Sequence, residues 1–211
     1  KFLVVDCTGV NKSEKLLEPY FERKASYVLI SAPIESSNVQ NIVYGINHQS
    51  IDTSAYKIFT AASCTTNCLA PIVKVLEENI GIKHGSITTI HNITNSQTIV
   101  DAPKNNLRRS RSGINSLIPT TTGSARAISL IYPELKGRLN GHAVRVPLLN
   151  ASLTDCVFEM KQNVEVDKIN QLFNEASNTY LRDILSYEEK PLVSSDYVNN
   201  PHSAIIDSLS T

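Results

Sequence analysis

A cysteine stands between an apolar run and a periodic segment in the stretch TAASCTTNCLAP, residues 60–71. The run at 56–60 predicts a strand, and apolar residues spaced i, i+3, i+4 and i+7 from Leu69 onward predict a helix. Cys64 would then lie at the first turn of this helix, where unsatisfied N–H groups and a partial positive charge favour a thiolate. Because the thiolate is the nucleophilic form of cysteine, this position suits attack on a carbonyl carbon.

The four cysteines also have a structural interpretation. Free cysteines are often buried small hydrophobic residues, which is the alternative for Cys64 and the expectation for Cys68, one helical turn further on. The C-x3-C pair has no second pair elsewhere, and Cys7 and Cys156 are isolated, so no metal site is predicted. Four scattered cysteines fit a reducing compartment, which predicts a cytoplasmic protein.

A cysteine nucleophile needs a base or a cation beside it. His91 is the best candidate, because it lies near the end of a predicted strand directly after the helix, and a strand–helix–strand path can return it to Cys64. A strand-end histidine with a structural role is the alternative. A structural role is the expectation for the remaining histidines, which are His48, His84, His142 and His202.

Other residues suit the binding of a phosphate group. Thr94 follows His91 closely, and TTTG at 120–123 offers hydroxyls and a glycine N–H in a turn. Arg145 has apolar neighbours in AVRVP, so it needs an anionic partner if it is buried. An ordinary turn and a solvent-facing arginine are the alternatives. A solvated or interface loop is the simplest interpretation of the cluster Arg108, Arg109 and Arg111.

Composition limits the class of protein. The chain has 211 residues, of which 41% are hydrophobic and 19% are charged, as in ordinary globular domains. Twenty basic and twenty acidic residues cancel, so neither nucleic acid nor a membrane is predicted as a partner.

The first part of the chain predicts a parallel βαβ unit. Buried strands are expected at 2–5 and 27–31, with a helix at 14–24 that Ser13 can cap and that Pro19 kinks or interrupts. A short strand or extended segment is expected at 41–47.

After the Cys64 helix the pattern changes. The segments 86–94 and 150–161 alternate between apolar and polar residues, as half-buried antiparallel strands do. A helix is expected over 122–130, and another from Asp167 with inward-facing apolar residues at Ile169, Leu172 and Phe173. We therefore expect a parallel α/β domain at 1–63 and an α+β domain at 64–211. The chain opens directly at an apolar run and stops after another, which predicts an internal piece of a longer protein.

Four motifs in order and spacing carry a family resemblance: SCTTNCLAP, TTIHNIT, IPTTTGSA and PELKGRLNGHAVRVP. They resemble the phosphorylating glyceraldehyde-3-phosphate dehydrogenases, and the resemblance extends from DCTGV and ISAP to PLVSSDY. It implies the C-terminal part of a Rossmann-like NAD-binding domain, followed by a mixed-sheet catalytic domain.

The resemblance implies a mechanism. Cys64 would attack the aldehyde of glyceraldehyde 3-phosphate, with His91 as base, and inorganic phosphate would cleave the resulting thioester to 1,3-bisphosphoglycerate. The substrate phosphate would bind at Thr94 and Arg145. Inorganic phosphate would bind at Ser63, Thr65, Thr122 and Gly123, and the dinucleotide at Thr8, Gly9, Ser31 and Ala32.

The resemblance also implies NAD as cofactor, with NADP open, and a cytoplasmic homotetramer, with a plastid location open. The family's Gly-rich loop and C-terminal asparagine would lie outside residues 1–211. Asn11 stands where many members have an aromatic residue. The loop KNNLRRSRSGI stands where the family usually has a sequence of the KLWRDGRGA type, and it resembles a subgroup that includes arsenate-resistance-associated members.

Two alternatives remain open at this stage. One is a dehydrogenase for another phosphorylated aldehyde, such as erythrose 4-phosphate, or an arsenate-using variant. The other is a non-catalytic protein, since the 211-residue chain alone is expected to bind NAD poorly and to turn over little.

Overall fold

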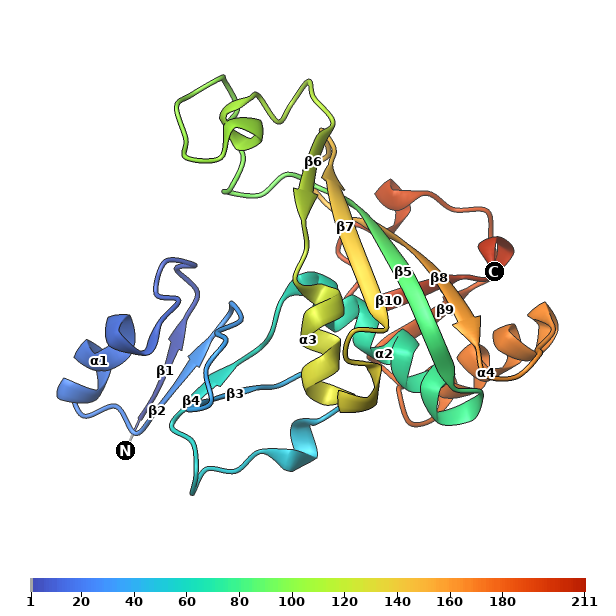
Figure 1. Cartoon of the computed structure of the whole chain (residues 1–211), viewed down its shortest axis with the longest axis horizontal. Helices are drawn as coiled ribbons and strands as arrows, with labels where there is room; N and C mark the ends of the chain where they lie inside the picture. The colour runs from blue at the N-terminus through green and yellow to red at the C-terminus, as the bar shows by residue number, and fades with distance from the viewer. Residues whose placement is uncertain (1) are drawn as a thin grey trace.

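The computed structural model describes residues 2–211, which form two four-stranded sheets and a two-stranded sheet around a central helix (Figure 1). The first sheet has the strand order β1-β2-β4-β3, and every neighbouring pair is parallel. Its strands are short: β1 (Leu3–Asp6), β2 (Tyr27–Ile30), β3 (Val39–Asn41) and β4 (Ile58–Thr60). The parallel α/β unit predicted for the first part of the chain is confirmed.

Helix α1 (Glu14–Glu22) connects β1 to β2. Ser13 occupies the N-cap position, but its side chain makes no capping hydrogen bond. The predicted interruption at Pro19 is wrong, because Pro19 lies inside a continuous helix. Both Pro19 and Lys15, whose carbonyl loses its partner, are exposed, so water can satisfy that group.

Two expectations for the first sheet need correction. The apolar run at 2–5 forms β1 but is not buried, since Leu3 and Val5 are 53% and 58% exposed on the sheet face away from α1. The strand expected at 41–47 ends at Asn41. Beyond it Gly45 has φ +82°, and the Asn47 side chain accepts from the Val43 N–H, so the chain turns into the short 3-10 helix His48–Ser50.

Helix α2 (Cys64–Asn79) follows β4 and packs at the centre of the molecule. Ser63 is its N-cap, and the Ser63 side chain accepts a hydrogen bond from the Thr66 N–H. Leu69 and Val73 are fully buried, and they join a large apolar cluster that continues into α3 (Ser124–Ile131).

The second sheet has the order β6-β7-β5-β8 and is mixed. Its strands are β5 (Ile82–His91), β6 (Ile118–Thr121), β7 (Leu139–Arg145) and β8 (Leu153–Met160). The expectation of antiparallel strands at 86–94 and 150–161 is confirmed, because β5 pairs with β8 in this way. Strand β7, which the sequence did not predict, pairs with β5 in parallel. The parallel pairing places His91 directly opposite Arg145.

The remaining elements complete the large core. Helix α4 (Val166–Asn178) buries Leu172 and Phe173 and partly buries Ile169, as predicted. Strands β9 (Leu185–Glu188) and β10 (Ala204–Asp207) form a separate parallel pair. Short 3-10 helices cover Leu107–Ser110, Pro133–Leu135, Ser194–Tyr197 and Ser208–Ser210. No helix in residues 2–211 is long and apolar enough to cross a membrane.

Candidate active site

The carboxyl ends of parallel strands share one edge of a sheet, and ligands of α/β folds bind at that edge. Thr8 and Gly9 follow β1, Ser31 and Ala32 follow β2, and Cys64 follows β4 after a short turn. Because β1, β2 and β4 are parallel neighbours, the three segments leave the sheet at the same edge.

The turn between β4 and Cys64 is sharp. Ala62 is buried with φ +56°, in the left-handed region that costs energy for a residue with a Cβ atom. Its N–H donates to the Thr60 hydroxyl at 3.1 Å. Backbone strain of this kind is often found where a reactive side chain is presented.

Cys64 and His91 lie against each other. The Cys64 Sγ is 3.4 Å from the His91 Nε2, the Cys64 side chain is exposed, and His91 is buried. The hydrogen bond from His91 lowers the pKa of the Cys64 thiol and outweighs the burial that raises it. The sequence therefore predicted correctly that these two residues would meet.

The other cysteines have different surroundings. Burial raises the pKa of the Cys68 thiol, whose nearest polar partner is the Thr154 hydroxyl at 3.9 Å. Burial also raises the pKa of Cys156 to about 12. Cys7 is exposed in the loop after β1. Cys68 and Cys156 pack against the large core, as was expected for Cys68.

Arg145 joins this pair from the neighbouring strand. Its Nη1 lies 2.7 Å from the His91 Nδ1 and donates to the Asn92 carbonyl at 3.0 Å. Burial lowers the pKa of Arg145, the nearby Cys64 raises it, and Arg109 lowers it again. Arg145 has no ion-pair partner among residues 2–211, and its buried Nε has no hydrogen-bond partner.

Arg109 was missed by the sequence analysis, which interpreted the arginine cluster as a solvated or interface loop. Arg109 is only partly exposed, donates from Nη2 to the Thr120 hydroxyl at 3.1 Å, and has a buried Nε without a partner. Arg108 and Arg111 are exposed, as expected. The only signal in the sequence was the position of Arg109 before IPTTTG, which is too weak to separate one arginine from its neighbours.

The predicted phosphate-binding residues are less closely connected. The Thr94 hydroxyl bonds to Ser96 and Gln97, and the Thr122 hydroxyl bonds to Ser124 at 2.9 Å. Gly123 is exposed at the N-cap of α3. Ser63 and Thr65 flank Cys64 at the start of α2. Across residues 2–211, no hydrogen bond joins Thr94 or Thr122 to Arg145 or Cys64.

The loop after β1 is fixed by the buried carboxylate of Asp6. It accepts from the Thr8 N–H at 2.8 Å, from the Thr8 hydroxyl at 2.6 Å, from Asn11 at 2.6 Å and from the Tyr20 hydroxyl at 3.0 Å. Burial raises the pKa of Asp6, but these hydrogen bonds together lower it to about 2. Asn11, which stands where an aromatic residue is common, is therefore part of the polar support of this loop.

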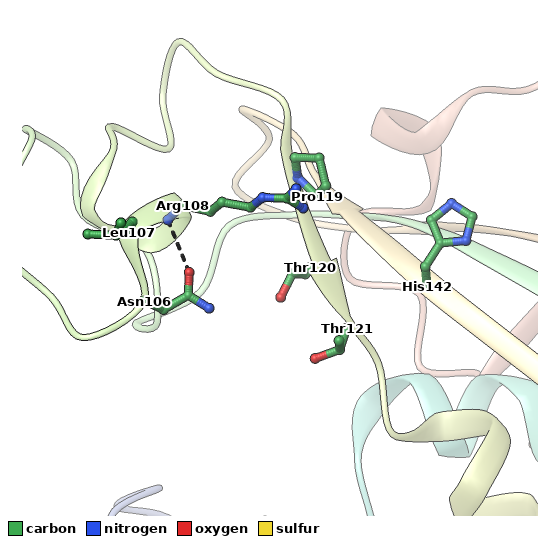
Figure 2. Close-up of a pocket in the computed structure, with 7 residues that line it drawn as sticks. All are labelled: Asn106, Leu107, Arg108, Pro119, Thr120, Thr121 and His142. Atoms are coloured by element: carbon green, nitrogen blue, oxygen red, sulfur yellow. Dashed lines mark hydrogen bonds between the residues drawn. The ribbon is translucent and has the colours of Figure 1, made fainter.

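A cavity of about 570 Å³ lies between the 3-10 helix Leu107–Ser110 and the strands β6 and β7 (Figure 2). Figure 2 shows Arg108 extended toward Pro119, and His142 on the neighbouring strand. Neither Cys64 nor His91 lines this cavity. It is therefore separate from the cysteine–histidine pair.

Comparisons with known proteins agree with this geometry. Residues 63–211 match the family model described as glyceraldehyde 3-phosphate dehydrogenase, C-terminal domain. The chain is 58% identical to glyceraldehyde-3-phosphate dehydrogenase 3 of Nostoc sp. over 210 residues, covering 99% of this chain and 62% of the relative.

Two further relatives give the same result. The chain is 46% identical to glyceraldehyde-3-phosphate dehydrogenase 2 of Bacillus subtilis and covers 61% of that protein. It is also 46% identical to glyceraldehyde-3-phosphate dehydrogenase of Geobacillus stearothermophilus and covers 62% of that protein. The chain thus spans a little over three fifths of the length of these relatives. On the strength of the family match and these identities, the chain belongs to the glyceraldehyde-3-phosphate dehydrogenase family.

Proposed function

We propose that this protein oxidises glyceraldehyde 3-phosphate to 1,3-bisphosphoglycerate, using a nicotinamide cofactor and inorganic phosphate. The observation that carries the proposal is the 3.4 Å contact between the Cys64 Sγ and the His91 Nε2 at the start of α2. The names of the similar proteins from Nostoc and Bacillus support the choice of substrate.

The chemistry divides between the two side chains. The Cys64 thiolate adds to the aldehyde carbon, and His91 gives its Nε2 proton to the oxygen, forming a thiohemiacetal. His91 then takes the hydroxyl proton back as the hemiacetal is oxidised to a thioester. Inorganic phosphate attacks the thioester carbonyl, the carbon–sulfur bond breaks, and the thiolate of Cys64 is released.

The residues at the carboxyl edge of the first sheet fit a dinucleotide. Thr8 and Ser31 are exposed there, although the Thr8 hydroxyl already donates to Asp6. Gly9 has φ +70° and a Cβ placed on it would meet no atom within 4 Å, so a ligand can approach its backbone closely. We propose that Thr8, Gly9, Ser31 and Ala32 line NAD, with NADP as the alternative. When bound, the dinucleotide supplies the hydride acceptor.

Phosphate recognition is proposed for two groups of residues. Thr94 and Arg145 would hold the phosphate of the substrate, and the half-buried guanidinium without an acidic partner supports this role for Arg145. Arg109 lies close enough to affect the charge of Arg145 and would add to the positive field. Inorganic phosphate would bind at Ser63, Thr65, Thr122 and Gly123.

We further propose that residues 1–63 and 64–211 act as a dinucleotide domain and a catalytic domain. A small cluster lies wholly within 1–63 and is separate from the large core, which supports this division, although Val43 and Ala62 pack into the large core. The small cluster consists of Leu17, Val28, Ile30, Ile34, Val39 and Ile58. A cytoplasmic homotetramer is proposed for the assembly. The exposed apolar residues Ile90, Leu153 and Val157 on the outer face of the second sheet support burial by another copy.

The thioester chemistry can be tested without a cofactor. In the reverse direction, Cys64 attacks the acyl carbon of 1,3-bisphosphoglycerate, the C1 phosphate leaves, and a 3-phosphoglyceroyl thioester remains on the protein. We expect peptide mass spectrometry to find this adduct on Cys64 in the 211-residue chain and not in Cys64→Ser. Absence of the adduct, in a chain shown to be folded by circular dichroism, would refute the proposal.

Breakdown of the same adduct separates the competing substrates and acceptors. Added inorganic phosphate should accelerate the loss of the 3-phosphoglyceroyl group from Cys64 and regenerate 1,3-bisphosphoglycerate. Loss that does not depend on phosphate would favour an enzyme that hydrolyses its thioester, such as one acting on erythrose 4-phosphate. A much stronger response to arsenate than to phosphate would favour the arsenate-using variant.

A further inference from the structure

The exposed residue Thr94 is held by one buried side chain, that of Gln97. Gln97 is only 8% exposed, and it lies in the turn that follows β5. The Gln97 Oε1 accepts from the Thr94 N–H at 3.1 Å, from the Thr94 hydroxyl at 3.3 Å and from the Ser96 hydroxyl at 3.2 Å. The Gln97 N–H in turn donates to the Thr94 carbonyl at 2.9 Å, so residues 94–97 form a closed turn.

The backbone N–H of Thr94 determines which end of the Gln97 amide faces the turn. A backbone N–H only donates, so it must meet an oxygen, and the reversed amide would place two donors 3.1 Å apart. The Gln97 Nε2 is therefore on the other side of the amide, where it is buried and has no hydrogen-bond partner among residues 2–211. A buried donor without a partner costs free energy, so the benefit of a glutamine at this position lies at its Oε1.

Close packing restrains the Gln97 side chain. Gly113 lies against it, because a Cβ placed on Gly113 would be 3.1 Å from the Gln97 Cβ and 3.2 Å from the Ile93 Cγ2. The Gly113 N–H donates to the Thr98 carbonyl at 2.8 Å, which ties the two segments together next to Gln97. The amide therefore has little freedom to move, and it holds the N–H and the hydroxyl of Thr94 in one place.

Two cations contact the same segment of the chain. Arg145 donates to the Asn92 carbonyl at 3.0 Å, and the Lys104 Nζ donates to the Ser96 carbonyl at 3.0 Å. In the part of the chain that the structure describes, neither cation forms an ion pair with an acidic residue. An anion that approaches Thr94 would therefore meet positive charge held just before and just after that residue.

We propose that Gln97 is a positioning residue of the substrate-phosphate site, whose Oε1 fixes the Thr94 N–H and keeps the Thr94 hydroxyl where it can donate to the anion. The inference rests on the proposed function, in which Thr94 binds the phosphate of the substrate. Gln97 is buried, so it acts through Thr94 and not on the substrate itself. When an anion binds, the single hydrogen of the Thr94 hydroxyl can turn from Oε1 to a phosphate oxygen, while the Thr94 N–H keeps its bond to Gln97.

Two acyl donors distinguish this role from general support of the fold. Cys64 can be acylated by 1,3-bisphosphoglycerate or by acetyl phosphate: in each case the thiolate attacks the acyl carbon, and the phosphate bonded to that carbon leaves. Only 1,3-bisphosphoglycerate carries a second phosphate for Thr94. Peptide mass spectrometry of the 211-residue chain gives the rate of acylation at each donor concentration. We expect Gln97→Met to raise the half-saturating concentration of 1,3-bisphosphoglycerate about fivefold, the scale of one hydrogen bond, and to leave acylation by acetyl phosphate unchanged.

Three further variants complete the comparison. Thr94→Val removes the hydroxyl itself and should weaken 1,3-bisphosphoglycerate at least as much as Gln97→Met. Gln97→Glu keeps an acceptor oxygen but adds a negative charge beside the anion, so it should weaken 1,3-bisphosphoglycerate more than Gln97→Met does. Gln49→Met, at an exposed glutamine in the 3-10 helix His48–Ser50, should affect neither donor. Equal losses with both donors, or a folded Gln97→Met chain that keeps the wild-type response to 1,3-bisphosphoglycerate, would overturn the proposal.

A second measurement separates failure of this inference from failure of the proposed function. Amide hydrogen exchange needs no ligand: the Thr94 N–H should exchange faster in Gln97→Met, while the Thr89 N–H inside β5 should be unchanged. An unchanged Thr94 exchange rate would refute the restraint by Gln97, even where Cys64 is acylated normally. No acylation of Cys64 by 1,3-bisphosphoglycerate in the folded chain would refute the proposed function, while faster Thr94 exchange in Gln97→Met would still support the restraint.

Discussion

At the scale of single residues, the reactivity of Cys64 depends on one neighbour. The hydrogen bond from His91 lowers the pKa of Cys64, whereas burial raises the pKa of Cys68 and raises that of Cys156 to about 12. The four thiols of the chain should therefore react at very different rates at mildly acidic pH.

Alkylation by iodoacetamide at about pH 6 should label Cys64 fastest, because an ordinary thiol is almost entirely protonated there. His91→Ala should slow the labelling of Cys64 about tenfold, by removing the group that stabilises its thiolate. Peptide mass spectrometry gives the rate for each cysteine, and His84→Ala on the same strand is the matched control. Equal rates for Cys64 and the exposed Cys7 would contradict this prediction.

Asp6 should give part of the chain's stability a characteristic pH dependence. Its pKa is about 2 in the folded chain against an ordinary 3.8, so the carboxylate stabilises the fold above about pH 4. That contribution is lost as the pH falls toward 2, where the folded state also takes up the proton.

We expect Asp6→Asn to lower the free energy of unfolding at pH 7 by about 1–3 kcal/mol, the range for hydrogen bonds to a charged group. The difference between the two chains in urea titrations should shrink as the pH is lowered from 4 to 2. Tyr20→Phe removes one of the four bonds and should show a smaller version of the same trend. A difference that stays constant with pH would show that the Asp6 carboxylate is not the cause.

At the scale of the elements, Ser63 at the start of α2 has a structural role and a proposed binding role. Ser63 caps the helix by accepting from the Thr66 N–H at 3.2 Å, and it is also proposed to bind inorganic phosphate. Substitutions can separate these roles, because aspartate caps helices well but repels an anion.

Ser63→Ala should lower the free energy of unfolding by about 1 kcal/mol through loss of the cap. Ser63→Asp should restore most of that stability while the phosphate-dependent loss of the Cys64 thioester remains slow. Thermal unfolding and the adduct assay measure the two effects on the same samples. Fast phosphate-dependent breakdown in Ser63→Asp would remove Ser63 from the phosphate site.

A structural feature could be predicted where the residues that determine it are adjacent in the sequence. The joint between β4 and α2 was predictable because an apolar run, Ser63 and a helical period are adjacent in sequence. Alternation in 86–94 marked a strand but carried no information about its partners, so the parallel pairing of β5 with β7 was missed. The burial of Arg109 was missed for the same reason, since it depends on Thr120 and on β6.

Exposure was the other property that local patterns predicted poorly. The run at 2–5 is apolar enough for a buried strand, yet Leu3 and Val5 are exposed because nothing in residues 2–211 covers that face of β1. Pro19 shows the opposite case, where a strong local signal had little effect because its cost falls on a solvent-exposed turn. The contact between Cys64 and His91 could be predicted because a sequence motif marks each of the two residues.

At the scale of the whole molecule, the outer face of the second sheet exposes apolar side chains that the described residues 2–211 leave uncovered. Leu153 and Val157 alternate along β8 toward solvent and are 57% and 64% exposed, and Ile90 beside them is 38% exposed. An apolar sheet face of this kind is costly in water and is usually covered by a partner.

Sedimentation should therefore show the 23.2 kDa chain associating with itself as its concentration rises. Val157→Lys should shift the equilibrium toward the monomer, because it would place a charge in the buried interface. Val193→Lys, at a site of equal exposure away from β8, should have no such effect. A chain that remains monomeric at all concentrations would refute the proposed use of this face.

The register that places His91 opposite Arg145 has a consequence for how the protein can change over evolution. The two residues are held by the backbone ladder of β5 and β7, and the long loop between β5 and β6 projects away from the sheet (Figure 1). Lengthening a flexible connection costs only about 0.6 kcal/mol for each doubling. Insertions and deletions in the exposed parts of this loop, away from Arg109, can therefore accumulate without moving His91 and Arg145, whereas a single-residue slip of either strand would separate the pair.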